Sequence, residues 1–262
     1  MTGSLEGRVA VIAGAGEGIG LSSALALAGE GADLVLGARR AEPLRELAAT
    51  VAERTGRKVL AVPTDIADAD ACRALVAAAA DGLGRVDAVV NVATYNPSGR
   101  VEDIDREEFR RAFDVNVLGV LEVSRAALPH MRAVGGGSIV QISTEAPRMK
   151  LPYMAAYAST KMAMEIASAT MAREVGRDGI RVNVVVAGYT DNAKLAAYLE
   201  SEAQRRGMSA EEVRADFASS TALKRITQPE DIAEAVLFLA SPRSRGMTGT
   251  VTHVTSGVVL EP

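Results

Sequence analysis

The chain has 262 residues, and 29 lysine and arginine residues against 33 acidic ones give a formal net charge of −4 at pH 7. Hydrophobic residues at 48% and charged residues at 24% are typical of a soluble globular protein and exclude a disordered or collagen-like chain. No basic stripe and no apolar run of about 18 residues occurs, and aromatic residues make up 3%, so we expect neither a nucleic-acid surface nor a membrane span.

Short β-branched runs alternate with longer, alanine-rich amphipathic segments along the chain. This alternation is typical of parallel strands joined by crossover helices. Strands are predicted at 9–13, 33–37, 59–63, 88–91, 138–142, 182–186 and 250–254. Helices are predicted at 19–30, 43–55, 69–83, 106–131, 153–175 and 229–239.

Several of the predicted strands are apolar on both faces, as in parallel sheets that helices cover on both sides. No proline-, serine- or glycine-rich linker divides the chain. We therefore expect an α/β fold in which residues 1–262 form a single domain. Its core should be a doubly wound parallel sheet of about seven strands with helices on both faces.

The first predicted strand ends in a glycine-rich turn that leads into the first helix. Gly14, Gly18 and Gly20 follow a Gly-x-x-x-Gly-x-Gly spacing, and Ile19 begins the helix. Glycines at such a turn let the backbone approach a pyrophosphate, which the N–H groups at the helix N-terminus then bind. The pattern predicts a dinucleotide site, and the alternative is a tight turn without a ligand.

The end of the second predicted strand bears on the choice of cofactor. A carboxylate there binds the ribose 2′-hydroxyl of NAD, whereas an arginine beside a small residue accommodates the 2′-phosphate of NADP. Ala38 occupies the carboxylate position and Arg39 follows it. The sequence therefore predicts NADP(H) in preference to NAD(H). The alternative is that Arg39 and Arg40 are solvated surface charges.

Cysteine and histidine are scarce. The single cysteine, Cys72, lies in the predicted helix 69–83 and can form neither an intramolecular disulfide nor a multi-cysteine metal site. We therefore expect no metal and a reducing, cytoplasmic location. The two histidines, His130 and His253, are expected to lie far from the other motifs, which argues against a hydrolase triad or a zinc site.

The helix predicted at 153–175 carries Tyr157 and Lys161, which lie four residues apart and therefore share a face. A lysine ammonium beside a phenol favours the phenolate, so we expect the pKa of Tyr157 to be lowered. Tyr157 could then act as a general base toward an alcohol and as a general acid toward a carbonyl. The alternative is a tyrosine packed on a lysine side chain at an exposed helix surface.

Residues 188–224 interrupt the alternation of strands and helices. Two short amphipathic patterns, at 193–206 and 209–219, predict a helical pair there. An insertion after a strand in such a fold usually lies over the crevice at the carboxyl ends of the strands, so we interpret this segment as a substrate lid. The alternative is a helical hairpin that only covers the core.

The glycine spacing together with Tyr157-Ala158-Ser159-Thr160-Lys161 resembles the short-chain dehydrogenase/reductase family over nearly the whole chain. The resemblance implies a Rossmann-like fold and an oxidoreductase that transfers a hydride between NADP(H) and a carbonyl or secondary alcohol of medium size. It also implies a homotetramer, assembled through the helices predicted at 106–131 and 153–175 and the C-terminal segment. No nucleic-acid or membrane partner is expected.

Two more members of the family's catalytic site can be placed by this resemblance. Asn116 stands where the family carries an asparagine that holds a water in a proton relay to the lysine, although a purely structural role is the alternative. Thr144 lies thirteen residues before Tyr157, where the family has a serine that binds the substrate oxygen. Threonine offers the same hydroxyl. Ser143 is adjacent, but strand alternation should point it the other way.

The resemblance assigns further residues to the cofactor. Asp65 and Ile66 resemble the family's adenine-binding pair, and Tyr157 and Lys161 also face the cofactor. The other assigned positions are Asn91, Ala93, Gly188, Thr190 and Asn192.

Several positions depart from the family's pattern. The family reads Thr-Gly, Asn-Asn-Ala-Gly and Pro-Gly where this chain reads Ala13-Gly14, Asn91-Val92-Ala93-Thr94 and Ala187-Gly188. Asn192 replaces a threonine that binds the carboxamide, and Glu17 stands where users of NADP often have a basic residue. These departures motivate an alternative function, a dinucleotide-binding sensor or regulatory protein that has lost turnover.

Overall fold

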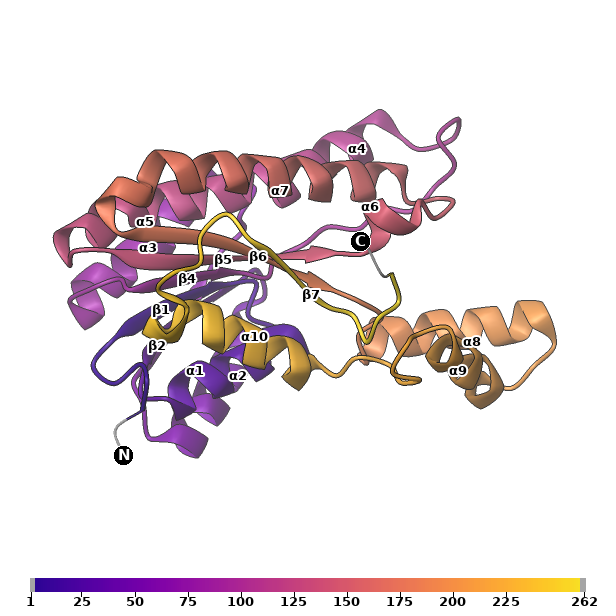
Figure 1. Cartoon of the computed structure of the whole chain (residues 1–262), viewed down its shortest axis with the longest axis horizontal. Coiled ribbons are helices and arrows are strands. Elements are labelled where there is room, and N and C mark those ends of the chain that lie inside the picture. Colours follow the sequence, from indigo (N-terminus) through magenta and orange to yellow (C-terminus); the bar gives the residue numbers. More distant parts are fainter. Residues whose placement is uncertain (1–2, 260–262) are drawn as a thin grey trace.

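The computed structural model describes residues 3–259, which form one seven-stranded sheet of order β3-β2-β1-β4-β5-β6-β7 (Figure 1). All neighbouring strands in it are parallel. The strands are β1 (Val9–Ala13), β2 (Asp33–Ala38), β3 (Val59–Pro63), β4 (Ala88–Asn91), β5 (Gly137–Thr144), β6 (Ile180–Ala187) and β7 (Val251–Val254). The strand order reverses between β1 and β4, which places a crevice for ligands at their carboxyl ends.

Helices cover both faces of the sheet, as the sequence predicts. In Figure 1, α1, α2 and α10 lie below the sheet and α3, α5 and α7 lie above it. The helices are α1 (Ile19–Gly29), α2 (Ala41–Thr55), α3 (Ala69–Leu83), α4 (Arg106–Phe113), α5 (Val120–Ala133), α6 (Ala146–Met149), α7 (Ala155–Val175), α8 (Ala193–Arg206), α9 (Ala210–Ser219) and α10 (Pro229–Ala240). The predicted fold class, a doubly wound α/β domain, is confirmed.

Strand β1 shows how the sequence builds both cores. Val9, Val11 and Ala13 pack into one apolar cluster, whereas Ala10 and Ile12 pack into the cluster on the opposite face. Successive side chains of a strand point to opposite faces, so a strand that is apolar throughout must be covered on both sides.

Two predicted helices differ from the observed ones. The segment predicted as one helix at 106–131 is a continuous rod, but a π-helix at Asp114–Gly119 joins α4 to α5, and α5 ends at Ala133. A Cβ at Gly119 would lie 2.2 Å from the Ile66 carbonyl oxygen, so the rod approaches the loop after β3 very closely there. Helix α7 begins at Ala155 rather than Tyr153, because Tyr153 has a φ of 67°, outside the helical region.

Helices α8 and α9 form a hairpin that extends beyond the carboxyl edge of the sheet (Figure 1). Leu199, Ala203, Val213 and Ile226 give the hairpin a small core of its own. The segments that lead into and out of the hairpin run side by side. Thr190 and Thr227 form a short parallel bridge, and the Asp191 N–H donates to the Thr227 carbonyl at 2.9 Å. The hairpin is therefore attached through a two-stranded stem.

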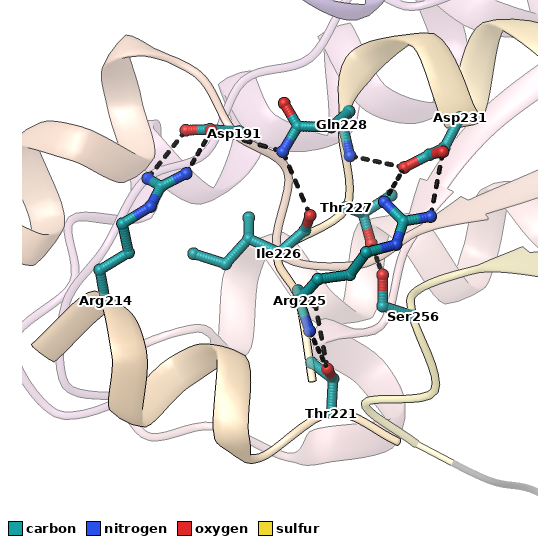
Figure 2. A network of polar contacts seen from close by, with 9 residues as sticks. All are labelled: Asp191, Arg214, Thr221, Arg225, Ile226, Thr227, Gln228, Asp231 and Ser256. Carbon is teal, nitrogen blue, oxygen red and sulfur yellow. Dashed lines mark hydrogen bonds and ion pairs between the residues drawn. The ribbon is translucent and has the colours of Figure 1, made fainter. Parts of the chain in front are cut away.

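A polar network fastens this stem (Figure 2). The Arg214 guanidinium on α9 binds both carboxylate oxygens of Asp191, and the Gln228 amide bridges Asp191 and the Ile226 carbonyl. On the other side, Arg225 pairs with Asp231 on α10. None of the helices within residues 3–259 is long and apolar enough to cross a membrane.

Candidate active site

The glycine turn between β1 and α1 is held tightly against the loop after β4. Gly14 has a φ of 94°, and a Cβ there would lie 2.2 Å from the Ala93 nitrogen. The N–H groups of Ile19 and Gly20 have no hydrogen-bond acceptor in the part of the chain that the structure describes. A glycine turn with free N–H groups at a helix N-terminus fits the pyrophosphate of a dinucleotide.

The residues predicted to choose the cofactor lie at the same edge of the sheet. Ala38 ends β2 and is half-buried, and Arg39 is exposed and forms no ion pair among residues 3–259. Asp65 follows β3, is exposed, and accepts a hydrogen bond from the Ala67 N–H at 3.1 Å. Ile66 is buried in the core. An unpaired guanidinium beside a small side chain leaves space and charge for a phosphate.

The structure brings Tyr157, Lys161 and Thr144 together at the carboxyl end of β5. The Tyr157 phenol lies near the hydroxyls of Thr144 and Thr94, both of which favour its ionised form. The Lys161 Nζ atom lies 5.9 Å from the centre of the Tyr157 ring and donates to the Ile142 carbonyl at 2.9 Å. Strand β5 extends as far as Thr144, which pairs with Ala187 of β6, and this places the Thr144 side chain at the carboxyl end of the strand.

The acidity of these groups differs from the prediction. Burial raises the pKa of the Tyr157 phenol, and the nearby hydroxyls of Thr94 and Thr144 lower it only in part. Lys161, 2% exposed, has its own pKa lowered to about 8 by burial, which the nearby Glu165 carboxylate partly offsets. The predicted lowering of the Tyr157 pKa by Lys161 is therefore wrong for the protein alone, because desolvation of the phenol outweighs every favourable interaction with the phenolate.

Asn116 lies in the π-helix and is fully buried. Its Oδ1 accepts from the Tyr95 N–H at 2.8 Å and from the Thr94 hydroxyl at 3.2 Å. Its Nδ2 donates to the Tyr95 carbonyl at 2.7 Å and to the Thr160 hydroxyl at 3.0 Å. The side-chain amide thus ties the loop after β4 to the turn of α7 that carries Tyr157. Its part in a proton relay stays a prediction.

Ser143 points away from Thr144, as strand alternation predicts, and donates to the Glu165 carboxylate. Glu165 lies one turn after Lys161 on α7, is 5% exposed, and binds the Arg148 guanidinium through both oxygens, at 2.8 and 3.1 Å. Sequence reasoning missed this ion pair. The spacing of Lys161 and Glu165, four residues apart on one helix face, could have indicated the carboxylate near Lys161, whereas no spacing indicates its partner Arg148 on α6.

His253 does not lie far from the motifs, and that prediction is wrong. Its Nδ1 lies 2.7 Å from an oxygen of Glu145, the buried residue that directly follows Thr144. Strand β7 is two strands away from β5 in the sheet, and the Glu145 side chain reaches across to it. Spacing along the chain does not reveal such a contact.

The remaining predicted cofactor residues lie around the crevice in different ways. The Asn91 amide points into the core, where it donates to Gln141 and Ser124 at 2.8 and 3.1 Å. Gly188 packs against Thr255, and the Thr190 hydroxyl donates to the Gly188 carbonyl at 3.0 Å.

Asn192 caps α8 by accepting from the Leu195 N–H at 3.0 Å. A Cβ at Gly18 would lie 3.7 Å from its Cβ, so the start of the hairpin faces the glycine turn. This contact places the hairpin directly beside the candidate cofactor crevice.

Comparison with known proteins gives consistent matches. A family model described as enoyl-(acyl carrier protein) reductase matches residues 14–259. An uncharacterized oxidoreductase of Methylorubrum extorquens is 37% identical over 254 residues, which cover 97% of this chain and 98% of that protein.

Two solved structures resemble the whole fold. The L-sorbose reductase of Gluconobacter frateurii, in complex with NADPH and L-sorbose, matches with a TM-score of 0.95 and 30% identity over 100% of both chains. An NAD⁺-bound xylitol dehydrogenase matches with a TM-score of 0.89 and 28% identity, over 97% of this chain and 99% of that one.

Proposed function

The chain belongs to the short-chain dehydrogenase/reductase family and is an oxidoreductase of that family, and from this premise we propose that it transfers a hydride between NADP(H) and a carbonyl or secondary alcohol of medium size. The observation that carries the proposal is the grouping of Tyr157, Thr144 and Lys161 at the carboxyl edge of the sheet, the edge at which the glycine turn also lies. A phenol, a hydroxyl and an ammonium at a dinucleotide crevice are the groups that proton transfer to a carbonyl oxygen requires.

The residues that would hold the cofactor fit it. The Gly14–Gly20 turn offers close backbone approach and free N–H groups to the pyrophosphate, and Arg39 offers a charge to a 2′-phosphate. When bound, the nicotinamide supplies or accepts the hydride. The backbone around Ala93, Gly188 and Thr190 and the side chain of Asn192 would border it on the crevice side.

The chain's own residues handle the proton. Tyr157 donates its phenolic proton to the carbonyl oxygen in reduction and takes a proton from the hydroxyl in oxidation. The Thr144 hydroxyl positions that oxygen. Lys161 remains mostly protonated at pH 7 because its pKa is about 8, so an ammonium lies beside the phenol as its charge changes.

The preference for NADP(H) rests on Ala38 and Arg39 at the end of β2. The NADPH complex of L-sorbose reductase is consistent with it, whereas the xylitol dehydrogenase binds NAD⁺. Both of these proteins are named for polyhydroxylated carbon chains, which supports testing ketoses and polyols first. The α8–α9 hairpin, within residues 188–224, would act as the substrate lid, because Asn192 at its start faces Gly18 of the glycine turn.

We further propose a homotetramer in the cytoplasm. Exposed apolar side chains lie along the α4–α5 rod and α7, among them Phe113, Leu118, Met162 and Ile166. Apolar surface of this kind is suited to burial between copies of the chain. The single, buried Cys72 fits a reducing compartment.

A panel of ketoses, polyols and cyclic ketones, each mixed with the protein and NADPH or NADP⁺, tests the proposed activity. We expect at least one compound to change the absorbance of the reduced nicotinamide at about 340 nm. Tight binding of NADPH with no turnover of any compound in either direction would instead support the dinucleotide-binding sensor.

A further inference from the structure

Asp191 lies between two residues that we assign to the cofactor, Thr190 and Asn192, but the proposed function gives it no role. The Asn192 side chain faces the glycine turn, since a Cβ at Gly18 would lie 3.7 Å from the Asn192 Cβ. The Asp191 backbone is fixed by its N–H, which donates to the Thr227 carbonyl at 2.9 Å. An acidic side chain therefore stands at the border between the hairpin and the proposed cofactor crevice.

The Asp191 carboxylate is bound on the hairpin side (Figure 2). The Arg214 guanidinium on α9 donates to its Oδ1 atom at 3.0 Å and also to its Oδ2 atom. The Gln228 amide donates to Oδ2 at 3.4 Å. The hydrogen bonds from Arg214 lower the pKa of the Asp191 carboxyl, so this group is ionised at pH 7. Arg214 is the cation that pairs with its charge.

The charge of this carboxylate matters because the proposed cofactor is an anion. The pyrophosphate of a dinucleotide is negatively charged, and the glycine turn proposed to bind it faces Asn192, the residue directly after Asp191. Like charges repel, and the repulsion is strongest where the protein excludes water. An Asp191 carboxylate without a partner would therefore weaken the binding of a dinucleotide.

We propose that Arg214 is a positioning residue of the cofactor site: it holds the Asp191 carboxylate on the hairpin side and neutralises its charge, so that Thr190 and Asn192 can border an anionic dinucleotide. The inference rests on the proposed function. Two hydrogen bonds from one planar guanidinium fix both the place and the orientation of a carboxylate, which the point charge of a lysine does not. Arg214 lies on α9, in the hairpin, and acts on the cofactor through Asp191.

The same stem offers a matched control. Arg225 binds both carboxylate oxygens of Asp231, at 2.5 and 3.1 Å, and joins the end of the hairpin to α10 (Figure 2). The side chains of the two ion pairs are similarly exposed, by 40% and 30% for Arg214 and Asp191 and by 45% and 30% for Arg225 and Asp231. Loss of either arginine should therefore destabilise the stem to a similar degree, whereas the Arg214 pair alone adjoins residues assigned to the cofactor.

The test is the Kd for NADPH, and separately for NADH, measured by the fluorescence of the cofactor without substrate. We expect Arg214→Met to raise the Kd about tenfold and Arg225→Met to change it less than about twofold. Arg214→Lys, which keeps the charge, should raise the Kd less than Arg214→Met does. In the double variant Asp191→Asn/Arg214→Met the unpaired charge is gone, so the Kd should return to within about threefold of wild type. Urea unfolding should give similar midpoints for Arg214→Met and Arg225→Met.

Equal Kd values for Arg214→Met and Arg225→Met would overturn the inference, and so would a double variant that binds as weakly as Arg214→Met alone. Should Arg214→Met fail to fold, the comparison of Arg214→Lys with Arg225→Lys decides in the same way.

These outcomes remain distinct from a failure of the proposed function. Because the measurement needs no turnover, an unsuccessful substrate screen leaves it intact. If wild type binds neither cofactor, the proposed function fails and this inference fails with it. If wild type binds a cofactor and the Kd is unchanged in Arg214→Met, only the role of Arg214 is removed.

Discussion

At the scale of single residues, Lys161 is the group whose chemistry and stability conflict most. Its side chain is 2% exposed, and its Nζ donates to one backbone carbonyl, at Ile142. Burial lowers its pKa from 10.5 to about 8, and the Glu165 carboxylate offsets part of that change. A buried ammonium of this kind destabilises the folded chain, and its retention is understandable only if the charge serves the site.

Replacing Lys161 by Met should abolish turnover and, at pH 7, leave the fold as stable as wild type or more so. The pKa difference between 10.5 and about 8 corresponds to about 3 kcal/mol of unfavourable charge burial, before the loss of the hydrogen bond to Ile142 is counted. Urea unfolding of both proteins measures this difference.

The pKa shift of Lys161 also predicts how the stability difference between the two proteins changes with pH. Between pH 8 and 10.5 the unfolded chain holds a proton on Lys161 that the folded chain has released, so wild-type stability gains from this group as pH rises. Lys161→Met lacks that gain, and its advantage should shrink over the same interval. A difference that stays constant with pH would show that Lys161 is not buried as an ammonium.

Arg39 supports a second prediction at this scale, which concerns cofactor choice. Arg39→Ala should raise the KM for NADPH at least tenfold and change the KM for NADH little, because only NADPH carries the 2′-phosphate. Arg54→Ala, which removes an exposed arginine from the last turn of α2, is the matched control and should affect neither. An equal rise in the KM for NADPH and for NADH in Arg39→Ala would show that the guanidinium does not contact the 2′-phosphate.

Part of the site could be predicted from residue spacing and part could not. Tyr157 and Lys161 share a helix face, and Thr144 ends a strand at the same edge, so local geometry brings them together. The raised pKa of Tyr157 depends on burial by residues distant in sequence, which no motif records. The contact of Glu145 with His253 depends on the order of strands in the sheet.

At the scale of elements, the alternation of strands and helices predicted all seven strands to within a few residues. The π-helix at Asp114–Gly119 was missed because one wide turn barely alters the apolar periodicity of a long helix. That turn nevertheless places Asn116 against Tyr95 and Thr160. The start of α7 was missed because Tyr153 adopts a positive φ that its residue type does not favour.

The turn between β1 and α1 allows a matched pair of substitutions. Gly14→Ala should lower the free energy of unfolding by at least about 2 kcal/mol, because φ is 94° and the new Cβ would meet the Ala93 nitrogen. Gly16→Ala should change it by less than about 0.5 kcal/mol, since its Cβ would meet nothing within 4 Å. Urea unfolding of both variants measures these changes. Equal losses in the free energy of unfolding would contradict the tight packing of this turn.

At the scale of the whole molecule, one rigid sheet carries the site and an attached hairpin borders it. The body has a core on each face of the sheet, while the hairpin has its own small core and a stem fastened by Asp191, Arg214 and Gln228 (Figure 2). The hairpin core is therefore separate from the two cores of the body, which is consistent with the proposed substrate lid.

The proposed tetramer is tested at the same scale. Ile166, on α7, is 64% exposed, and Ile166→Glu places a charge in the apolar surface expected to be buried between copies. Light scattering should show a tetramer for wild type and a smaller species for this variant. Val101→Glu, at a site 78% exposed in the loop after β4, is the control and should remain tetrameric. Identical masses for all three proteins would remove α7 from the interface.

The most direct test of the central claim, proton transfer by the Tyr157 phenol, is the comparison of wild type with Tyr157→Phe, once a substrate is known. The account predicts that kcat falls at least about a hundredfold while the Kd for NADPH changes less than about twofold. A Tyr157→Phe protein with wild-type kcat would contradict it.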